Sequence, residues 1–211
     1  MLHDDNILPS VLPALEALNL LGISVFAVSG AVVAARHQQT FVTFIFFAVV
    51  TGVGGGTVRD LLIGAPVFWL NENLTLLICF LSAATVWLTP AQLWNGRTLD
   101  WLDGVGLAAY AVYGAAKALA NGVAPVPSFG LGVLTACLGG IIRDILAGQP
   151  SIIMRPELYV TAAALSSGLM VALTLAGLPI WMAACTAAIV GFALRAGAIR
   201  FHLSLPVYDR Q

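Results

Sequence analysis

Charged residues are scarce in this chain: only 9% of its 211 residues are Asp, Glu, Lys or Arg. A soluble domain carries about a quarter of such residues, so too few are present to cover a water-facing surface. A basic excess is missing too, since the net charge is -1, which argues against a nucleic-acid partner. With 60% hydrophobic residues and a mean hydropathy of +0.96, the composition predicts an integral membrane protein.

Paired cysteines are also absent. Cys79, Cys137 and Cys185 stand alone in apolar runs, which is typical of small buried residues rather than of disulfide or metal sites. The histidines lie outside the apolar segments, so no metal or other cofactor is predicted. No nucleophile–base arrangement points to catalysis, and we do not expect an enzyme. The N-terminus lacks the basic region of a cleaved signal peptide, so the first apolar segment is expected to remain as a span.

Seven apolar segments fill most of the chain, and a membrane-spanning helix needs about 20 such residues. Short connections rich in turn-forming residues separate them. The sequence therefore predicts an all-α integral membrane protein with seven transmembrane helices in a single membrane domain, 1–211. The segments are residues 11–35, 41–63, 74–88, 102–119, 129–146, 158–175 and 180–194, with the seventh helix reaching about 198 and a cytoplasmic tail at 199–211.

A glycine-rich motif occurs twice in these segments, 84 positions apart. Both copies follow the pattern Gly-Gly-x-x-Arg-Asp-x-x-x-Gly-x-Pro, beginning at Gly55 and at Gly139. Glycines weaken a helix and a buried arginine is costly in lipid. Because both features recur in register, the motif favours a function near the centre of the membrane.

The same offset relates the three segments around each motif. Further matched pairs are Gly22 with Gly106, Phe26 with Tyr110, and Gly30 with Gly114. Because each triplet has an odd number of spans, the second triplet must enter the membrane from the opposite side. The sequence thus predicts two inverted three-helix repeats, at about 11–90 and 95–175, followed by an unpaired seventh helix.

Cationic residues are unevenly distributed between the two sides of the predicted membrane. If the N-terminus is outside, the inner side carries Arg36, Arg97, Arg155, Arg195, Arg200 and Arg210, whereas the outer side carries Asp4, Asp5, Glu16 and Glu72. The positive-inside rule therefore predicts an external N-terminus and a cytoplasmic C-terminus.

The two glycine clusters approach the midplane from opposite sides, and we expect both helices to bend or unwind there across a cavity. Carbonyls freed by such a break can coordinate a cation, whereas isolated glycines are typical of close helix packing. A nucleotide site is not supported, because no Gly-Lys-Ser/Thr ending or βαβ pattern is present. The candidate residues of an ion pathway are Ser29, Thr51, Gly52, Gly54, Gly55, Gly56, Arg59, Tyr110, Lys117, Gly139, Gly140 and Arg143.

The arginines of the motifs admit two interpretations. Arg59 and Arg143 either line or gate a polar path, or tie helices together through carboxylates. Adjacent helical side chains project about 100° apart. We therefore expect Asp60 and Asp144 to form structural ion pairs with neighbouring helices while each arginine turns to the cavity. Lys117 either extends to the membrane surface or faces the pore.

Seven spans arranged as three plus three plus one, with this motif in spans two and five, resemble the prokaryotic trimeric intracellular cation (TRIC) channel family. The same segments are similar to a related bacterial glycine transporter family. The resemblance implies a homotrimer among membrane lipids in the plasma (inner) membrane of a prokaryote. Each protomer would have a pore, lined by kinked spans two and five, that conducts K+ and, less well, Na+. The alternative is a secondary transporter of a small zwitterion such as glycine, whose carboxylate needs a cationic partner.

Overall fold

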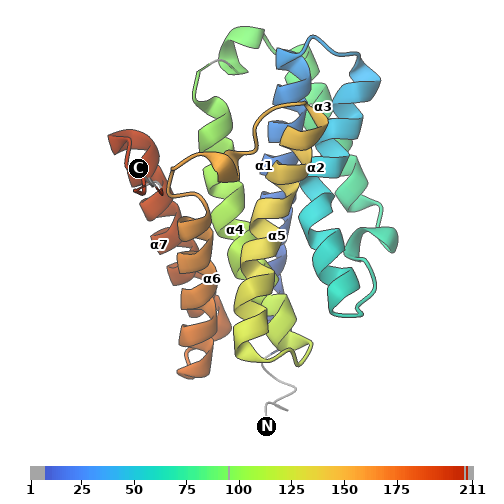
Figure 1. The fold of residues 1–211 in the computed structure, drawn as a ribbon. Coiled ribbons are helices and arrows are strands. Elements are labelled where there is room, and N and C mark those ends of the chain that lie inside the picture. The colour runs from blue at the N-terminus through green and yellow to red at the C-terminus, as the bar shows by residue number, and fades with distance from the viewer. Residues whose placement is uncertain (1–7, 95, 207, 209–211) are drawn as a thin grey trace.

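The computed structural model describes residues 8–94, 96–206 and 208, which form seven α-helices and three short 3-10 turns, with no β-strand among them. Successive helices run in alternating directions along one common axis (Figure 1). The predicted all-α fold with seven helices is confirmed. The helices are α1 (Leu8–Arg36), α2 (Phe41–Leu62), α3 (Leu74–Leu88), α4 (Thr98–Ala120), α5 (Pro125–Leu146), α6 (Val160–Leu175) and α7 (Ile180–Phe201), and the 3-10 turns are η1 (Phe68–Leu70), η2 (Ala91–Trp94) and η3 (Ile152–Met154).

Three helix ends differ most from the predicted segments. Helices α4 and α5 begin before the apolar segments 102–119 and 129–146, because hydropathy detects the apolar part of a helix and not its first turn. In α5 this first turn starts with Pro125, where a missing N–H costs no hydrogen bond. Helix α7 continues to Phe201, so the predicted tail starts too early. Asp4, Asp5 and Arg210, which entered the orientation argument, lie outside the described residues.

The length and composition of the helices fit a membrane. Four of the described helices, namely α1, α2, α5 and α7, are long and apolar enough to cross one. Helices α3 and α6 are apolar but shorter, with 15 and 16 residues. Helix α4 has 23 residues and carries Asp100, Asp103 and Lys117. Helix α4, which belongs to the second triplet, therefore brings three charged side chains into the bundle.

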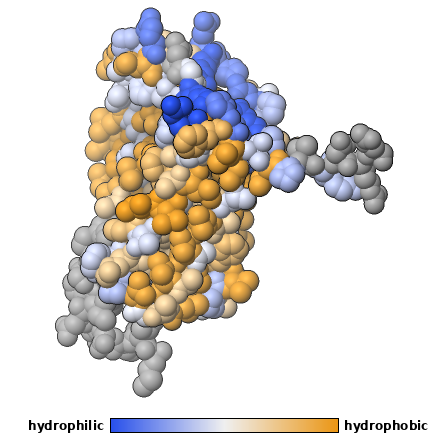
Figure 2. Space-filling view, turned by 90° about the vertical axis from the view of Figure 1, so that its left-hand side faces the viewer, coloured by the Kyte–Doolittle hydropathy of each residue, from blue (hydrophilic) through white to orange (hydrophobic). Residues whose placement is uncertain are grey.

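The outer surface is apolar along the helices. Figure 2 shows hydrophobic residues over the flank of the molecule and hydrophilic residues gathered at one end. We call this end the polar end; it holds the connections α1–α2, α3–α4 and α5–α6. Large apolar side chains such as Val42, Leu61, Leu88 and Ile189 are more exposed than buried. A soluble surface rarely carries so continuous an apolar area, which identifies a multi-pass membrane protein.

The two helix triplets meet in matched contacts. Phe26 of α1 and Tyr110 of α4 occupy equivalent positions, and their rings lie 5.3 Å apart between centroids. Gly22 faces the Tyr110 ring, and its equivalent Gly106 faces the Phe26 ring. Such reciprocity is what a two-fold relation produces, and it is consistent with two inverted repeats. Helix α7 packs on α4 and α6, outside this relation.

Candidate functional site

The two glycine clusters lie where α2 crosses α5, and both helices are α-helical without interruption through them. The prediction was that the helices bend or unwind there, and of these two the unwinding is wrong. A Cβ added to Gly55 would clash with the carbonyl of Thr135, and a Cβ added to Gly139 would clash with the carbonyl of Thr51. These two contacts are equivalent at the 84-residue offset. The glycines at these two points thus let the backbones of the two helices touch.

The other glycines of the motifs also face protein. Gly54 faces the end of the Ile142 side chain, and Gly56 faces the ring of Phe68. The carbonyl of Gly52 accepts a hydrogen bond of 2.7 Å from the Tyr110 hydroxyl. Tyr110 is therefore buried and held by the backbone of α2.

Arg59 is buried near the C-terminal end of α2, with 1% of its surface exposed. Its Nε donates to Asp60 Oδ1 at 2.9 Å, and Lys117 Nζ lies 2.8 Å from the same oxygen. The backbone N–H of Phe68 donates to Asp60 Oδ2 at 3.0 Å. The guanidinium lies 4.9 Å from the ring centroid of Tyr113. We call these five residues the Arg59 cluster; it holds two cations and one carboxylate.

Arg143, also 1% exposed, occupies the equivalent position on α5. Its Nε donates to Asp144 Oδ1 at 2.9 Å, and its Nη1 lies 2.6 Å from Asp103 Oδ1 of α4. Nη1 also donates to the hydroxyl of Ser29 in α1. The backbone N–H of Ile152 donates to Asp144 Oδ2 at 2.9 Å. We call these five residues the Arg143 cluster; it holds one cation and two carboxylates.

Matched positions hold both clusters. Phe68 and Ile152 are equivalent, and each donates its backbone N–H to the aspartate eight residues earlier. Tyr113 and Ser29 are equivalent as well, and each contacts the arginine of the other triplet. The clusters therefore share one backbone frame and differ in their charged side chains.

One expectation about these residues is corrected. Each arginine pairs directly with the aspartate that follows it, although adjacent helical side chains diverge by about 100°. The long arginine side chain folds back along the helix and thereby spans this angle. The expectation that the arginines turn away from Asp60 and Asp144 toward a cavity is wrong.

The sequence interpretation missed Asp103 and misplaced Arg195. Asp103 stands one residue inside the predicted span 102–119, where it was not singled out, yet it is fully buried. Arg195 was counted as an inner-surface cation, but α7 continues past it and leaves it 0% exposed. Its Nη1 lies 2.9 Å from Glu157 Oε2, and its guanidinium lies 5.4 Å from the Tyr159 ring centroid. A charge within an apolar helix was the available signal for Asp103, whereas Arg195 lay just beyond the predicted segment 180–194.

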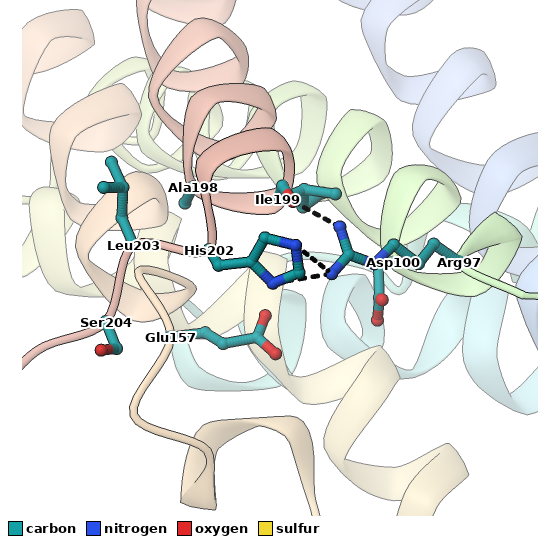
Figure 3. Close-up of a pocket in the computed structure, with 8 residues that line it drawn as sticks. All are labelled: Arg97, Asp100, Glu157, Ala198, Ile199, His202, Leu203 and Ser204. Atoms are coloured by element: carbon teal, nitrogen blue, oxygen red, sulfur yellow. Dashed lines mark hydrogen bonds between the residues drawn. The ribbon is translucent and has the colours of Figure 1, made fainter.

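A pocket of about 120 Å³ lies at the polar end, between α4, α7 and the segment before α6. Figure 3 shows the carboxylates of Asp100 and Glu157 beside a contact between Arg97 and His202. Arg97 also donates to the carbonyl of Ile199 at 2.7 Å. Asp100 lies in the first turn of α4, ahead of the apolar segment. Its pKa is raised mainly by burial and secondly by the negative charge of the nearby Glu157. Among the described residues no group of His, Cys, Asp and Glu is arranged for a metal.

Buried charge clusters inside a bundle of apolar helices are typical of membrane proteins that function within the bilayer, such as channels and transporters. The family model described as "Glycine transporter" matches residues 16–91 and 100–175. Each match covers one helix triplet, so the same model recognises both halves. The chain belongs to this family, whose curated relatives carry the name UPF0126.

Relatives align over most of this chain. The UPF0126 inner membrane protein YadS of Escherichia coli is 35% identical over 198 residues, which cover 90% of this chain and 94% of YadS. The UPF0126 membrane protein of Vibrio cholerae is 34% identical over 200 residues, covering 92% of this chain and 82% of that protein. YvgT of Bacillus subtilis is 40% identical over 164 residues, covering 76% of this chain and 80% of YvgT.

Solved structures of TRIC channels share the whole fold. The TRIC trimeric intracellular cation channel orthologue from Rhodobacter sphaeroides superposes with a TM-score of 0.83 at 39% identity, covering 90% of this chain and 98% of that chain. A second TRIC cation channel superposes with a TM-score of 0.82 at 27% identity, covering 93% of this chain and 98% of that chain. The predicted resemblance to the prokaryotic TRIC channels, and to the related glycine transporter family, is confirmed.

Proposed function

We propose that this protein is a monovalent cation channel that conducts K+ and, less well, Na+ through a pore in each protomer. The observation that carries the proposal is the likeness to a TRIC cation channel along 98% of that chain at 39% identity. We further propose a homotrimer in the inner membrane of a prokaryote, with the N-terminus outside and the polar end in the cytoplasm. The relative YadS is named an inner membrane protein, in agreement with this location.

The proposed route passes the crossing of α2 and α5, between the Arg59 cluster and the Arg143 cluster. In the conformation described, Gly55 and Gly139 bring these helices into contact, so conduction requires them to bend or separate. Glycine lowers the cost of bending a helix because it is a weak helix former. The hydroxyl of Thr51, fully buried and without a hydrogen-bond partner, is available to an ion at this crossing.

The charges along this route are compatible with a cation. Arg143 is paired with both Asp103 and Asp144, so its cluster carries one excess negative charge. The Arg59 cluster carries one excess positive charge, and its Lys117 is 20% exposed. A permeating cation thus gains attraction at one end of the route and meets a barrier at the other, where movement of Lys117 away from the path lowers the barrier.

A secondary transporter of a small zwitterion such as glycine is the second candidate, because the family model is described as a glycine transporter. Such a substrate needs a free cation for its carboxylate. The nitrogens of Arg143 are already bound to Ser29, Asp103 and Asp144. Arg143 therefore has no free donor in the conformation described, whereas Arg59 Nη2 has no hydrogen-bond partner, so a transported zwitterion would bind its carboxylate at Arg59.

Reconstitution into a planar bilayer with K+, Na+ and Cl- gradients tests the proposal. A channel produces unitary currents whose reversal potential follows the K+ gradient. Saturable glycine uptake into liposomes from the same preparation, without unitary currents, would establish the transporter instead. The mass of the detergent-solubilised protein tests the homotrimer, and protease access to a C-terminal tag in spheroplasts tests the orientation.

A further inference from the structure

Buried polar atoms without hydrogen-bond partners gather between α4, α6 and α7. Among the described residues they include Asp103 Oδ2, the hydroxyl of Tyr159 and the guanidinium nitrogens of Arg195, whose contact with Glu157 lacks hydrogen-bond geometry. An unsatisfied buried polar atom costs about 1–3 kcal/mol. In folded proteins such atoms are usually satisfied by ordered water. Three adjoining residues whose buried polar atoms have no hydrogen-bond partner indicate that water enters here.

The atoms of this group that are nearest to the Arg143 cluster lie beside Gly140. A Cβ built there would lie 3.2 Å from the Tyr159 hydroxyl, 3.9 Å from Asp103 Oδ2 and 3.7 Å from Arg143 Nη2. Because Gly140 has no side chain, the Tyr159 hydroxyl, Asp103 Oδ2 and Arg143 Nη2 all lie close to its backbone, and the first two have no hydrogen-bond partner. A water molecule is satisfied by two to four such groups.

From this position the polar groups continue to the polar end. The guanidinium of Arg195 lies 5.4 Å from the Tyr159 ring centroid, and its Nη1 lies 2.9 Å from Glu157 Oε2. Glu157 in turn lines the pocket at the polar end, beside Asp100 and His202 (Figure 3). Polar groups therefore lie at intervals from the Arg143 cluster to the pocket, where the partly exposed Glu157 is the last of them.

Among the described residues the Arg59 cluster holds one unpartnered buried atom, Arg59 Nη2, but no such chain of residues leads away from it. The positions equivalent to Asp103 and Tyr159 are Asn19 and Thr75, and the Thr75 hydroxyl donates to Glu72 at 2.5 Å. Arg195 lies on α7, which falls outside the two triplets. The polar chain therefore depends on the seventh helix and not on the repeat.

We propose that a water-filled branch runs between α4, α6 and α7, from the Arg143 cluster past Tyr159 and Arg195 to the pocket at the polar end. We assign this branch as the entrance through which hydrated monovalent cations reach the Arg143 cluster. The assignment of cations as the species that enter rests on the proposed channel function, whereas the presence of water is inferred from the unpartnered atoms alone. At the pocket, Asp100 and Glu157 face Arg155 and Arg195, whereas the Arg143 cluster at the other end carries one excess negative charge. The attraction for a cation therefore comes from the Arg143 cluster.

Hydroxyl-radical footprinting of the wild-type protein tests the water without any measurement of transport. Tyr159 and Tyr110 are each 1% exposed, but only the Tyr110 hydroxyl has a bonding partner, the carbonyl of Gly52. We expect Tyr159 to be labelled several-fold faster than Tyr110, because radicals form in adjoining water. Equal labelling of the two tyrosines would overturn the branch.

The entrance is tested by labelling Ser204→Cys, an exposed position that lines the pocket, in a Cys185→Ser background with a bulky cationic thiol reagent. We expect K+ flux to fall several-fold. The matched control is Gln39→Cys, exposed at the same end but outside this pocket, whose labelling leaves flux unchanged. Flux that survives labelling at Ser204 overturns the entrance. If Tyr159 is labelled while the wild type conducts no ions, the branch stands and the channel function fails.

Discussion

The Arg59 cluster and the Arg143 cluster share the same backbone frame, but their excess charges have opposite signs. In the Arg59 cluster one carboxylate, Asp60, serves two cations. In the Arg143 cluster one cation serves two carboxylates, Asp103 and Asp144. The comparison teaches that the sole charge of its sign is the indispensable partner in each cluster: Asp60 in one and Arg143 in the other.

The clusters also differ in how they hold the guanidinium. Ser29 supplies a hydroxyl to Arg143, whereas the equivalent Tyr113 supplies a ring face to Arg59. An aromatic face attracts a cation by about 0.5–2 kcal/mol without bringing a negative charge. The ring therefore substitutes for the second carboxylate that the Arg59 cluster lacks.

The largest effect is expected from Arg143→Met, which leaves two buried carboxylates without a cation. Breaking a buried pair in this way costs about 3–5 kcal/mol. Arg59→Met is the matched control and should cost less, because Asp60 keeps Lys117 and the N–H of Phe68. Thermal unfolding in detergent measures both variants. Equal losses would contradict the comparison.

Substitution of the carboxylates should destabilise the Arg59 cluster more than the Arg143 cluster, which is the opposite of the order expected for the arginines. Asp60→Asn leaves Arg59 and Lys117 without a counter-charge, so we expect a loss of about 2–3 kcal/mol. Asp103→Asn leaves Arg143 paired with Asp144 and should cost less. The same unfolding assay applies. A greater loss for Asp103→Asn than for Asp60→Asn would show that charge balance does not decide stability here.

The glycine crossing should respond equally from both sides, in contrast to the clusters. Gly55→Ala and Gly139→Ala each drive a methyl group into a backbone carbonyl of the other triplet, and overpacking of this kind costs about 1–3 kcal/mol. Gly54→Ala is the control, because the end of the Ile142 side chain can move aside. Unequal melting temperatures for Gly55→Ala and Gly139→Ala would break the two-fold relation.

The smallest change in stability is expected for Lys117→Gln, because this ion pair is partly exposed and such pairs contribute about 1 kcal/mol or less. Its effect on conduction should be larger than its effect on stability. Removal of the excess positive charge should raise the unitary K+ current. Lys117→Arg keeps this charge and should therefore conduct like the wild type. A current that is unchanged in Lys117→Gln would exclude this residue from the pathway.

Much of the fold could be predicted from the sequence, because hydropathy and the 84-residue offset report burial in lipid and internal repetition directly. The helix ends at Thr98, Pro125 and Phe201 could not, since polar terminal turns carry no hydropathy signal. The sequence identifies the glycine clusters but does not predict that both helices stay α-helical and touch there. A weak helix former permits both a broken helix and a close crossing, and only the position of the neighbouring helix decides between them.

The candidate site was predicted in part. The motif identified Arg59, Arg143 and their aspartates, because a charge in an apolar run is conspicuous. Asp103 and Arg195 lay near the limits assigned to their spans, where a charge is expected at the membrane surface. Only the three-dimensional path of α4 and α7 shows that both are buried.

The contact between Phe26 and Tyr110 has a further consequence. Where two equivalent halves meet at their axis, a residue touches its own counterpart, so any substitution there is seen by both halves at once. The two rings are nearly alike, but only Tyr110 has a hydroxyl, and it binds the backbone of α2 at Gly52. The corresponding backbone atom of α5, at Ala136, receives nothing from Phe26. At this pair of rings, therefore, the Tyr110 hydroxyl bonds the second half to the first and Phe26 makes no equivalent bond, so the two halves differ at the very point where they meet.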